Sequence, residues 1–414
     1  MNEAYEKSKS SSGMMSAAVS PHNLMVDRVR RQRLAEQMRV ANSTSLVLEI
    51  RRSHVLLDAF NSIWRREERE MLRPIKLRLG EDSGEEGMDL GGVQQEFFGL
   101  AMAEALDPDY GTFTVDARTR MTWFQPGSPE PLWKFELIGT IVSLAVYNGL
   151  TLPITFPKAL YRRLLDQEVT ELHHIQDGWP DLAAGLTTLL EWNIVDGNIE
   201  DIFARTYEFS VSQFGQNVSR DMSASDSWPQ FPDITESANP DDASMVTDTN
   251  RNQYVSDYIR WLTDVSVRPQ FEAFKRGFFT CITPRSITLF DAATLQSLVE
   301  GEQMIDVSEL RRVARYQGWD ASHRAVRDFW SVVKKFDLDQ KRKLLEFVTA
   351  TDRVPVGGMR NMQFTLQKNG QDDVHLPTSA TCFGILLLPE YSSKEVMKEK
   401  LLTALENSKG FGQM

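Results

Sequence analysis

Apolar residues recur every three to four positions in several stretches of the chain, which predicts amphipathic helices. Ser53 precedes one such stripe, and a second stretch, residues 135–147, is apolar nearly all round, which predicts a helix buried inside a large domain. A leucine stripe covers residues 182–190, and residues 250–279 are helical in pattern and rich in aromatic side chains. The chain up to residue 316 is therefore predicted to be mostly helical.

Strands are predicted at three places by alternation or by short apolar runs. Ile75, Leu77 and Leu79 alternate with basic residues, and Phe364 and Leu366 alternate in the same way, as in half-buried strands. The run 385–388 is wholly apolar and is closed by Pro389, which indicates a short buried strand. The polar stretch 210–250, with three prolines, predicts a long loop or an irregular hairpin.

The last ninety residues have the pattern of a separate small unit. Asp337 with Gln340, and Ser392 with Glu395, have the spacing of capping boxes at the starts of two helices. Helices and strands around one small core give an α/β unit, and the whole chain is then of the α+β class. A short polar stretch with one glycine, residues 316–322, precedes this unit and predicts a hinge or domain boundary.

Composition narrows the class of protein. A chain of 414 residues predicts two or three domains, and no apolar run approaches the roughly 20 residues of a membrane span. The net charge of −12 argues against nucleic acid as a partner and favours other proteins. Two distant cysteines make neither a disulfide framework nor a metal site, and the polar N-terminus lacks a secretory signal. A reducing, intracellular compartment is expected.

The N-terminal region and one acidic loop are interpreted without a binding or catalytic role. Residues 1–20 are predicted to be disordered, and the arginine-rich helical stretch 22–40 is interpreted as a solvated helix face. Residues 80–98 carry five acidic side chains between glycines, but their spacing does not match a calcium loop. We interpret this stretch as an acidic turn, with Gly91 and Gly92 opening a helix.

Cys382 is the candidate for covalent chemistry. It lies where a polar loop enters the apolar run 385–388, so its thiol would be both positioned and reachable. The alternative is a structural thiol, because free cysteines are among the most buried residues. Composition alone favours this alternative.

Four motifs in order resemble the HECT family of ubiquitin-protein ligases. They are TATDRVPVGG (residues 349–358), LPTSATCF (376–383), LPEYSSKE (388–395) and the terminal GFGQM (410–414). The resemblance continues upstream and covers roughly residues 45–414, and the C-terminal end is most similar to the Angelman-syndrome ligase branch. This resemblance favours a catalytic role for Cys382 over a structural one.

The resemblance implies a bilobal catalytic domain of defined layout. Residues 1–44 would be an extension, 45–316 the N-lobe, and 322–414 the C-lobe with the catalytic cysteine. A subdomain at about 170–265 would bind a ubiquitin-conjugating enzyme, and residues 317–321, with Gln317 and Gly318, would be the hinge. No metal and no cofactor is implied.

The resemblance also assigns a reaction. Ubiquitin would pass from the conjugating enzyme to Cys382 as a thioester and then to a lysine of a protein substrate. Thr381 would help to hold the carbonyl, and Phe411 would dock the tail during transfer to lysine. Position 380 is Ala, where many members have a polar side chain, so any help from that side chain in lysine attack is absent.

The family's apolar groove for the conjugating enzyme corresponds by motif position to six residues. Tyr254 and Tyr258 stand at i and i+4, and tyrosines with wet hydroxyl groups suit an interface. For the leucines, a place in the core is an equally good interpretation. The six residues are Leu182, Leu186, Leu189, Tyr207, Tyr254 and Tyr258.

Two other classes of function stay open. A cysteine hydrolase such as a deubiquitinase needs a histidine within reach of the thiol, and six histidines are present. A non-catalytic binding module would need no reactive thiol. We expect a cytoplasmic, or also nuclear, ligase without membrane partners. Either the sequence is a catalytic fragment of a longer ligase, or substrate recognition lies in the N-terminal extension or on another chain.

Overall fold

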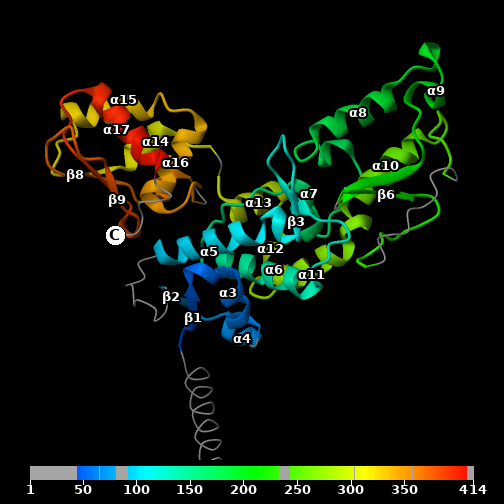
Figure 1. The fold of residues 1–414 in the computed structure, drawn as a ribbon, viewed down its shortest axis with the longest axis horizontal. Coiled ribbons are helices and arrows are strands. Elements are labelled where there is room, and N and C mark those ends of the chain that lie inside the picture. The colour runs from blue at the N-terminus through cyan, green and yellow to red at the C-terminus, as the bar shows by residue number, and fades with distance from the viewer. Residues whose placement is uncertain are drawn as a thin grey trace, which may run out of the picture. The chain divides into compact units, whose positions relative to one another are not determined.

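The computed structural model of the chain describes residues 44–64, 66–80, 92–213, 215–232, 243–302, 304–355 and 358–407 (Figure 1). The chain divides into two compact units, Met1–Leu46 and Val47–Met414, and nearly all described residues belong to the second. The predictions for residues 1–40 and for the acidic turn 81–91 lie outside the described residues. Helices and strands are mixed along the chain, as expected for the α+β class.

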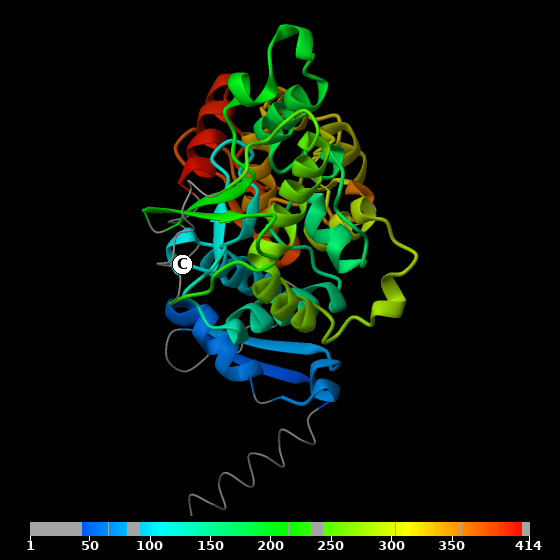
Figure 2. The same cartoon turned by 90° about the vertical axis from the view of Figure 1, so that its right-hand side faces the viewer.

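The first described elements confirm a predicted helix and a predicted strand. β1 (Leu46–Arg51) pairs with β2 (Ile75–Gly80) in a two-stranded sheet, and α3 (Val55–Ile63) buries the apolar face that the sequence predicts. Figure 2 shows α3 beside this sheet. The short helices η1 (Arg52–His54) and α4 (Glu68–Met71) complete the segment, and α4 begins with a capping box.

Two helices that pack unusually closely form the centre of the large helical region. α6 (Leu132–Tyr147) is buried on most sides, as predicted, and packs against α11 (Arg268–Phe278) (Figure 1). A Cβ atom on Gly139 would lie 2.1 Å from the Phe274 carbonyl oxygen, and one on Gly277 would lie 1.8 Å from that of Glu136. Only glycine at both positions permits this approach, so these two residues fix the helix pair.

The other elements of this region surround that pair. α5 (Gly92–Ala105) begins at the predicted glycine and is followed by η2 (Pro108–Tyr110). β3 (Phe113–Val115) and β4 (Thr122–Phe124) form a hairpin, and Phe113, Phe124 and Phe274 belong to one buried aromatic cluster. The remaining elements are α7 (Lys158–Leu164), α12 (Pro284–Ile287) and α13 (Ala292–Glu300).

A smaller helical and β-hairpin region follows α7. It contains η3 (Leu172–His174), α8 (Pro180–Glu191), η4 (Ile194–Asp196), α9 (Ile199–Phe203) and α10 (Arg251–Thr263). The polar stretch includes the hairpin β5 (Glu208–Gln213) and β6 (Gln216–Asp221). The helical pattern at residues 250–279 is interrupted by η7 (Val265–Val267). α11 begins directly after it at Arg268, and Pro269 in its first turn lacks the N–H that a continuous helix would need.

The C-terminal part has a hydrophobic core of its own, made of residues between Leu310 and Leu405. Its sheet has the order β7-β8-β10-β9, with β8 (Thr365–Lys368) parallel to both β7 (Arg315–Gln317) and β10 (Ile385–Leu388). β9 (Thr378–Ala380) is the antiparallel edge strand. The helices are α14 (Val307–Val313), α15 (Arg324–Val333), α16 (Leu338–Thr349) and α17 (Lys394–Glu406), with short turns η8 (Met359–Asn361) and η9 (Thr381–Phe383).

The helix caps agree with the sequence at one site and differ at the other. Asp337 and Gln340 form the predicted capping box of α16. At α17 the capping residue is Ser393, whose hydroxyl accepts from the Val396 N–H at 3.2 Å, so the prediction of Ser392 was wrong by one position. Either of two adjacent serines fits the sequence pattern, and only the backbone conformation decides between them.

The predicted hinge at residues 317–321 is wrong, because these residues belong to the C-terminal part. Gln317 lies in β7, which pairs with β8 through Arg315–Thr365, Tyr316–Leu366 and Gln317–Gln367. Trp319 is buried in the same core. A rotation there would break a sheet and expose a tryptophan. Among the described residues between α13 and α14, Glu302 forms only an isolated bridge and none belongs to a helix or strand element, and Gly301 has φ +73°.

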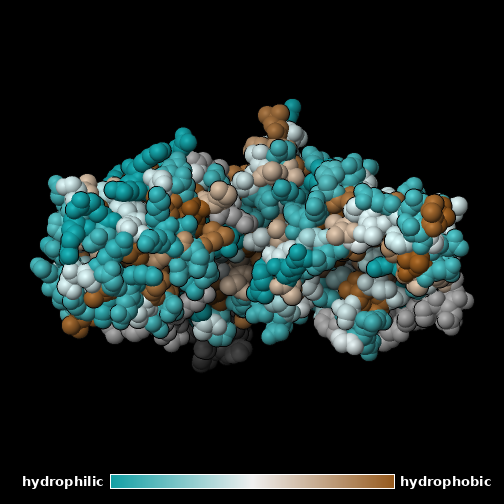
Figure 3. Space-filling model, turned by 90° about the horizontal axis from the view of Figure 1, so that it is seen from above, coloured by the Kyte–Doolittle hydropathy of each residue, from teal (hydrophilic) through white to brown (hydrophobic). Residues whose placement is uncertain are grey.

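The surface carries no large apolar area on the face drawn in Figure 3, where apolar residues form small patches among polar ones. Among the described residues, no helix combines the length and the apolar character needed to cross a bilayer.

Candidate active site

The backbone around Cys382 forms a tight turn between two strands. Cys382 lies in η9, directly between β9 and β10, which pair through Ile385–Ala380, Leu386–Ser379 and Leu387–Thr378. Leu386 and Leu388 are buried, whereas the exposed fraction of Phe383, next to the cysteine, is 53%. The sequence prediction of a cysteine at the entry to a buried strand is confirmed for the backbone.

Gly384 fixes this turn from its C-terminal side. Its φ is +59°, and a Cβ atom there would lie 2.3 Å from the Gln363 carbonyl oxygen. The Gly384 N–H donates to the Thr381 carbonyl at 3.2 Å, and the Thr365 N–H donates to the Gly384 carbonyl at 2.7 Å. The turn that carries Cys382 is thus held to the central strand β8, which positions it without any side chain.

The histidine nearest in sequence is held by an acidic residue of its own loop. His375 Nδ1 lies 3.0 Å from Asp372 Oδ2, and its backbone carbonyl accepts from the Tyr391 hydroxyl at 2.7 Å. The His375 side chain is 76% exposed. The chemistry of a thiol does not require a strong base, since a small thiolate fraction is already nucleophilic at neutral pH.

The second cysteine is a poor nucleophile. Cys281 is buried, its N–H donates to Ser143 Oγ at 2.9 Å, and burial raises the pKa of its thiol to about 11. Because the thiolate is the reactive form, Cys281 has little reactivity at neutral pH. It serves as a matched control for Cys382.

Most of the predicted groove for a conjugating enzyme is core. Tyr254 is 1% exposed, and Tyr207, Leu186 and Leu189 are also buried. Tyr207 and Tyr254 have ring centroids 5.4 Å apart, and the Tyr207 hydroxyl donates to Asp257 Oδ2 at 2.7 Å. The two tyrosines of α10 do share a helix face, but that face packs on β5 and α8. The interface interpretation is therefore wrong for these four residues, whereas Leu182 and Tyr258 are half-buried.

A different set of apolar side chains is exposed beside this core. The exposed fractions of Ile194, Val195 and Ile202 are 50%, 88% and 51%. They lie on η4 and α9, which follow α8, and the Trp192 ring N–H donates to the Gly197 carbonyl at 3.0 Å to close the turn. In the sequence these apolar residues flank an Asp-Gly-Asn turn, a pattern that does not by itself predict a binding surface.

A buried polar network links the loop after α16 to the region before α7. The Arg353 guanidinium donates to the Ile154 carbonyl at 3.0 Å and to Thr155 Oγ1 at 2.8 Å, and Val354 pairs with Glu302 through an antiparallel bridge. This loop belongs to the TATDRVPVGG motif. The motif therefore has a structural part in joining the C-terminal core to the rest of the unit.

Glu300, at the end of α13, is the acidic member of this network. Its Oε1 accepts from the Phe156 N–H at 2.8 Å and from the Tyr161 hydroxyl at 2.7 Å. The residue is 1% exposed, and burial raises its carboxyl pKa to about 7. Its second carboxyl oxygen, Oε2, has no hydrogen-bond partner among the described residues.

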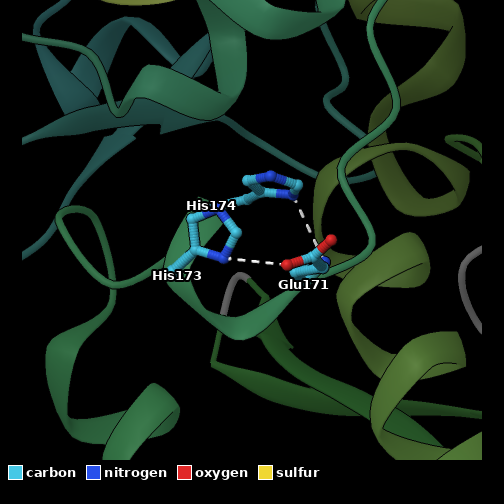
Figure 4. Close-up of side chains that lie close together, drawn as sticks. All are labelled: Glu171, His173 and His174. Carbon is cyan, nitrogen blue, oxygen red and sulfur yellow. Dashed lines mark hydrogen bonds and ion pairs between the residues drawn. The ribbon is translucent and has the colours of Figure 1, made fainter.

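Glu171, His173 and His174 lie close enough to be considered as metal ligands (Figure 4). His173 Nδ1 lies 3.0 Å from Glu171 Oε2. His174 Nδ1, however, accepts from the backbone N–H groups of Thr170 and Glu171 at 3.4 and 3.3 Å, as in a helix cap. A neutral histidine that accepts at Nδ1 carries its proton on Nε2, so neither nitrogen is free to bind a cation. We assign the group to the start of η3.

Of the other two predicted catalytic residues, the structure describes Thr381 but not Phe411. Thr381 is the first residue of η9, and its carbonyl accepts from Gly384 as described above. Its proposed role toward a carbonyl group stays a prediction. Phe411 lies outside the described residues, and the prediction for it stays open.

Comparison with known proteins assigns a family. A family model described as "HECT-domain (ubiquitin-transferase)" matches residues 99–414. A mouse protein named "Probable E3 ubiquitin-protein ligase HECTD2" is 32% identical over 401 residues, which cover 94% of this chain and 48% of that protein. The human protein named "Probable E3 ubiquitin-protein ligase HERC4" is 31% identical over 399 residues, with coverages of 95% and 36%. The chain thus spans about half or less of the length of these relatives.

Proposed function

The chain belongs to the HECT-domain (ubiquitin-transferase) family, and on that premise we propose that it is an E3 ubiquitin-protein ligase with Cys382 as its acceptor. The observation that carries the proposal is the LPTSATCF motif, whose cysteine lies on a rigid turn inside the matched region. From its terminal motifs, we propose that the chain is related to the branch of the family that includes the Angelman-syndrome ligase. We place the protein in the cytoplasm, or also in the nucleus.

The reaction has two covalent steps. In the first, the Cys382 thiolate attacks the carbonyl carbon of the ubiquitin thioester, a new C–S bond forms, the old C–S bond breaks, and the conjugating enzyme's cysteine leaves as a thiolate. In the second, a neutral lysine amine attacks the same carbon, an amide bond forms, the C–S bond to Cys382 breaks, Cys382 leaves as a thiolate, and the amine's proton passes to water. The first step exchanges one thioester for another, so it requires mainly the positioning of nucleophile and carbonyl. The turn fixed by Gly384 and Gln363 provides this positioning.

The residues next to Cys382 in the sequence offer few side chains that could assist the second step. The backbone N–H groups of η9 and the Thr381 hydroxyl are the donors nearest in sequence to the acceptor cysteine. Ala380 ends β9 and has no polar side chain. We propose that lysine attack depends on how the substrate and the C-terminal tail with Phe411 are placed.

One cysteine must meet the conjugating enzyme and then the substrate, so the part that carries it must move. We propose two lobes, one ending with α13 and one beginning with α14, joined by residues 301–306. Hinges absorb such motion in a few residues between elements. This stretch supports the proposal because it lies between α13 and α14, which belong to parts with separate cores.

We propose that the conjugating enzyme docks on the exposed apolar residues of η4 and α9. Ile194, Val195 and Ile202 are exposed apolar side chains, whereas Tyr207 and Tyr254 are buried and Leu182 and Tyr258 are half-buried. Apolar anchors near a rigid support are the usual centres of protein interfaces. No nucleic acid, membrane or cofactor takes part in this proposal.

The test is a pulse-chase reaction with labelled ubiquitin. A conjugating enzyme charged with ubiquitin is mixed with the protein, and the products are separated with and without reducing agent. A ligase gives a reducible adduct followed by ubiquitinated lysine. Release of free ubiquitin alone would indicate a hydrolase, and an unchanged charged enzyme would indicate a binding module, so either outcome would contradict the proposal.

A further inference from the structure

An open pocket of about 370 Å³ lies between α14 and α15 of the C-terminal part. It is separate from the cysteine turn and from the exposed apolar residues of η4 and α9, and the ligase activity gives it no role. The residues that line it are Val307, Ser308, Arg311, Arg312, Trp330 and Lys334.

Helical spacing brings these residues to one place. Ser308 stands three and four positions before Arg311 and Arg312, so the side of α14 that carries it also carries these two guanidinium groups. Lys334 follows Trp330 by four positions at the end of α15. Two helices therefore supply three cationic side chains to one pocket.

The wall of the pocket is rigid. Trp330 is 2% exposed, and its ring N–H donates to the Tyr316 hydroxyl at 2.9 Å, which orients the ring. Leu310 lies in the hydrophobic core beneath α14, and Val332 and Val333 anchor the end of α15. The cations thus extend from two helices that are fixed to a common core.

The three cations of the pocket have no ion-pair partner within the described part of the chain. Neither Arg311, Arg312 nor Lys334 has a side-chain hydrogen bond or ion pair with any other described residue, and the lining includes no acidic side chain. Asp306 is the acid that Arg312 influences: its Oδ1 accepts from the backbone N–H groups of Ser308 and Glu309 at 2.8 and 3.3 Å, and these bonds, with a smaller contribution from the Arg312 charge, lower the pKa of its carboxyl. Glu309 instead lies 3.9 Å from Arg360.

A basic residue in the last turn of a helix is common, because it interacts favourably with the helix dipole. The helix dipole accounts for a basic residue at the end of each helix, but it does not explain why basic residues from two helices line the same pocket. In a chain of net charge −12, three cations that repel one another indicate that an anion supplies the missing partner.

We propose that this pocket binds a phosphate monoester. Such a group carries a charge of about −1.5 to −2 at neutral pH and three acceptor oxygens, which match two guanidinium groups and one ammonium group. A carboxylate offers one charge and two oxygens, so it would leave part of the positive charge uncompensated. Val307 and the Trp330 ring give an apolar side for the carbon atoms that bear the phosphate. The ester can belong to a phosphorylated protein side chain or to a small phosphorylated metabolite.

The experiment measures binding of three probes to the whole chain by calorimetry at low salt. The probes are inorganic phosphate, a short peptide with one phosphoserine, and the same peptide with glutamate at that position. We expect the phosphopeptide to bind at least tenfold more tightly than the glutamate peptide. Phosphate binding as strong as that of the phosphopeptide would indicate a small-molecule source, and much weaker phosphate binding would indicate a protein source.

Variants locate the site. Arg311→Gln and Lys334→Gln should each weaken phosphopeptide binding roughly tenfold, the usual effect of losing a charged hydrogen bond. Both side chains are exposed, so the melting temperature should not change. Lys398→Gln, on the exposed side of α17, is the matched control and should bind like the unmodified protein.

Three outcomes would overturn the proposal. They are no binding of either phosphate probe at millimolar concentration, equal binding of the glutamate peptide, and equal weakening by Lys398→Gln and Arg311→Gln. The last would show attraction to the whole surface and no defined site. None of these outcomes bears on transfer of ubiquitin to Cys382, so the two proposals fail separately.

Discussion

Replacing Glu300 by glutamine should remove the part of the pH dependence of stability that arises from this one buried carboxyl. The carboxyl is buried against the Phe156 N–H and the Tyr161 hydroxyl, and burial raises its pKa from 4.5 to about 7. The folded state then binds a proton that the unfolded chain has released. This contribution to stability is complete below about pH 4.5 and is lost as the pH rises through about 7.

The size of the effect follows from that difference in pKa. Each pKa unit corresponds to about 1.4 kcal/mol, so ionisation of Glu300 costs the fold about 3 kcal/mol by pH 8. Glutamine stays neutral and can accept the same two hydrogen bonds through its carbonyl oxygen. We therefore expect Glu300→Gln to be more stable than the unmodified protein by about 1 kcal/mol or less near pH 5 and by about 3 kcal/mol at pH 8.

The assay is urea unfolding followed by tryptophan fluorescence, at intervals from pH 5 to pH 8.5. The difference between the two proteins isolates Glu300, since other titrating groups such as His174, whose pKa is lowered by burial, are present in both. Glu302→Gln is the matched control, because Glu302 is exposed and joins Val354 only through its backbone. If Glu300→Gln kept the pH slope of the unmodified protein, the burial argument would be refuted.

Three further predictions concern the proposed interfaces. Tyr254→Ala should lower the free energy of unfolding by about 3–5 kcal/mol, the usual cost of removing a buried aromatic ring. An unchanged melting temperature would contradict the burial of Tyr254. Val195→Asp should leave the melting temperature unchanged but slow charging of Cys382 at limiting concentrations of conjugating enzyme at least tenfold; normal charging would place the docking surface elsewhere. Phe411→Ala should leave thioester formation on Cys382 unchanged and impair transfer of ubiquitin to lysine, as measured for each step by single-turnover kinetics. An equal loss in both steps would contradict a role of Phe411 in the second step alone.

The elements that depend on local pattern were predictable from the sequence. The helix α3, the strand β2 and the short strand after Cys382 all lie where periodicity places them, because each buries one face or one apolar run. The position of Cys382 at the entry to β10 followed from the same argument. The proposal that it is catalytic depends on the family motifs, since local pattern favours a structural thiol.

The predictions were wrong where contacts between residues far apart in the sequence determine the local structure. Three-residue β7 is too short to show alternation, and it becomes a strand only through pairing with β8, about fifty residues later in the chain, so residues 317–321 resembled a hinge. Tyr254 and Tyr258 share a helix face, but the sequence does not say that β5 covers it. The contact of Arg353 with Ile154 joins residues about two hundred positions apart and has no local signal.

The most direct test of the central claim is to trap the acceptor. In Cys382→Ser, ubiquitin transferred from a charged conjugating enzyme would form an oxygen ester, which resists thiol reducing agents but is cleaved by hydroxide. We predict a thiol-sensitive adduct on the unmodified protein, a thiol-resistant adduct on Cys382→Ser mapped to residue 382 by mass spectrometry, and an unmodified pattern in Cys281→Ser. A thiol-sensitive ubiquitin adduct that persists in Cys382→Ser would contradict the assignment.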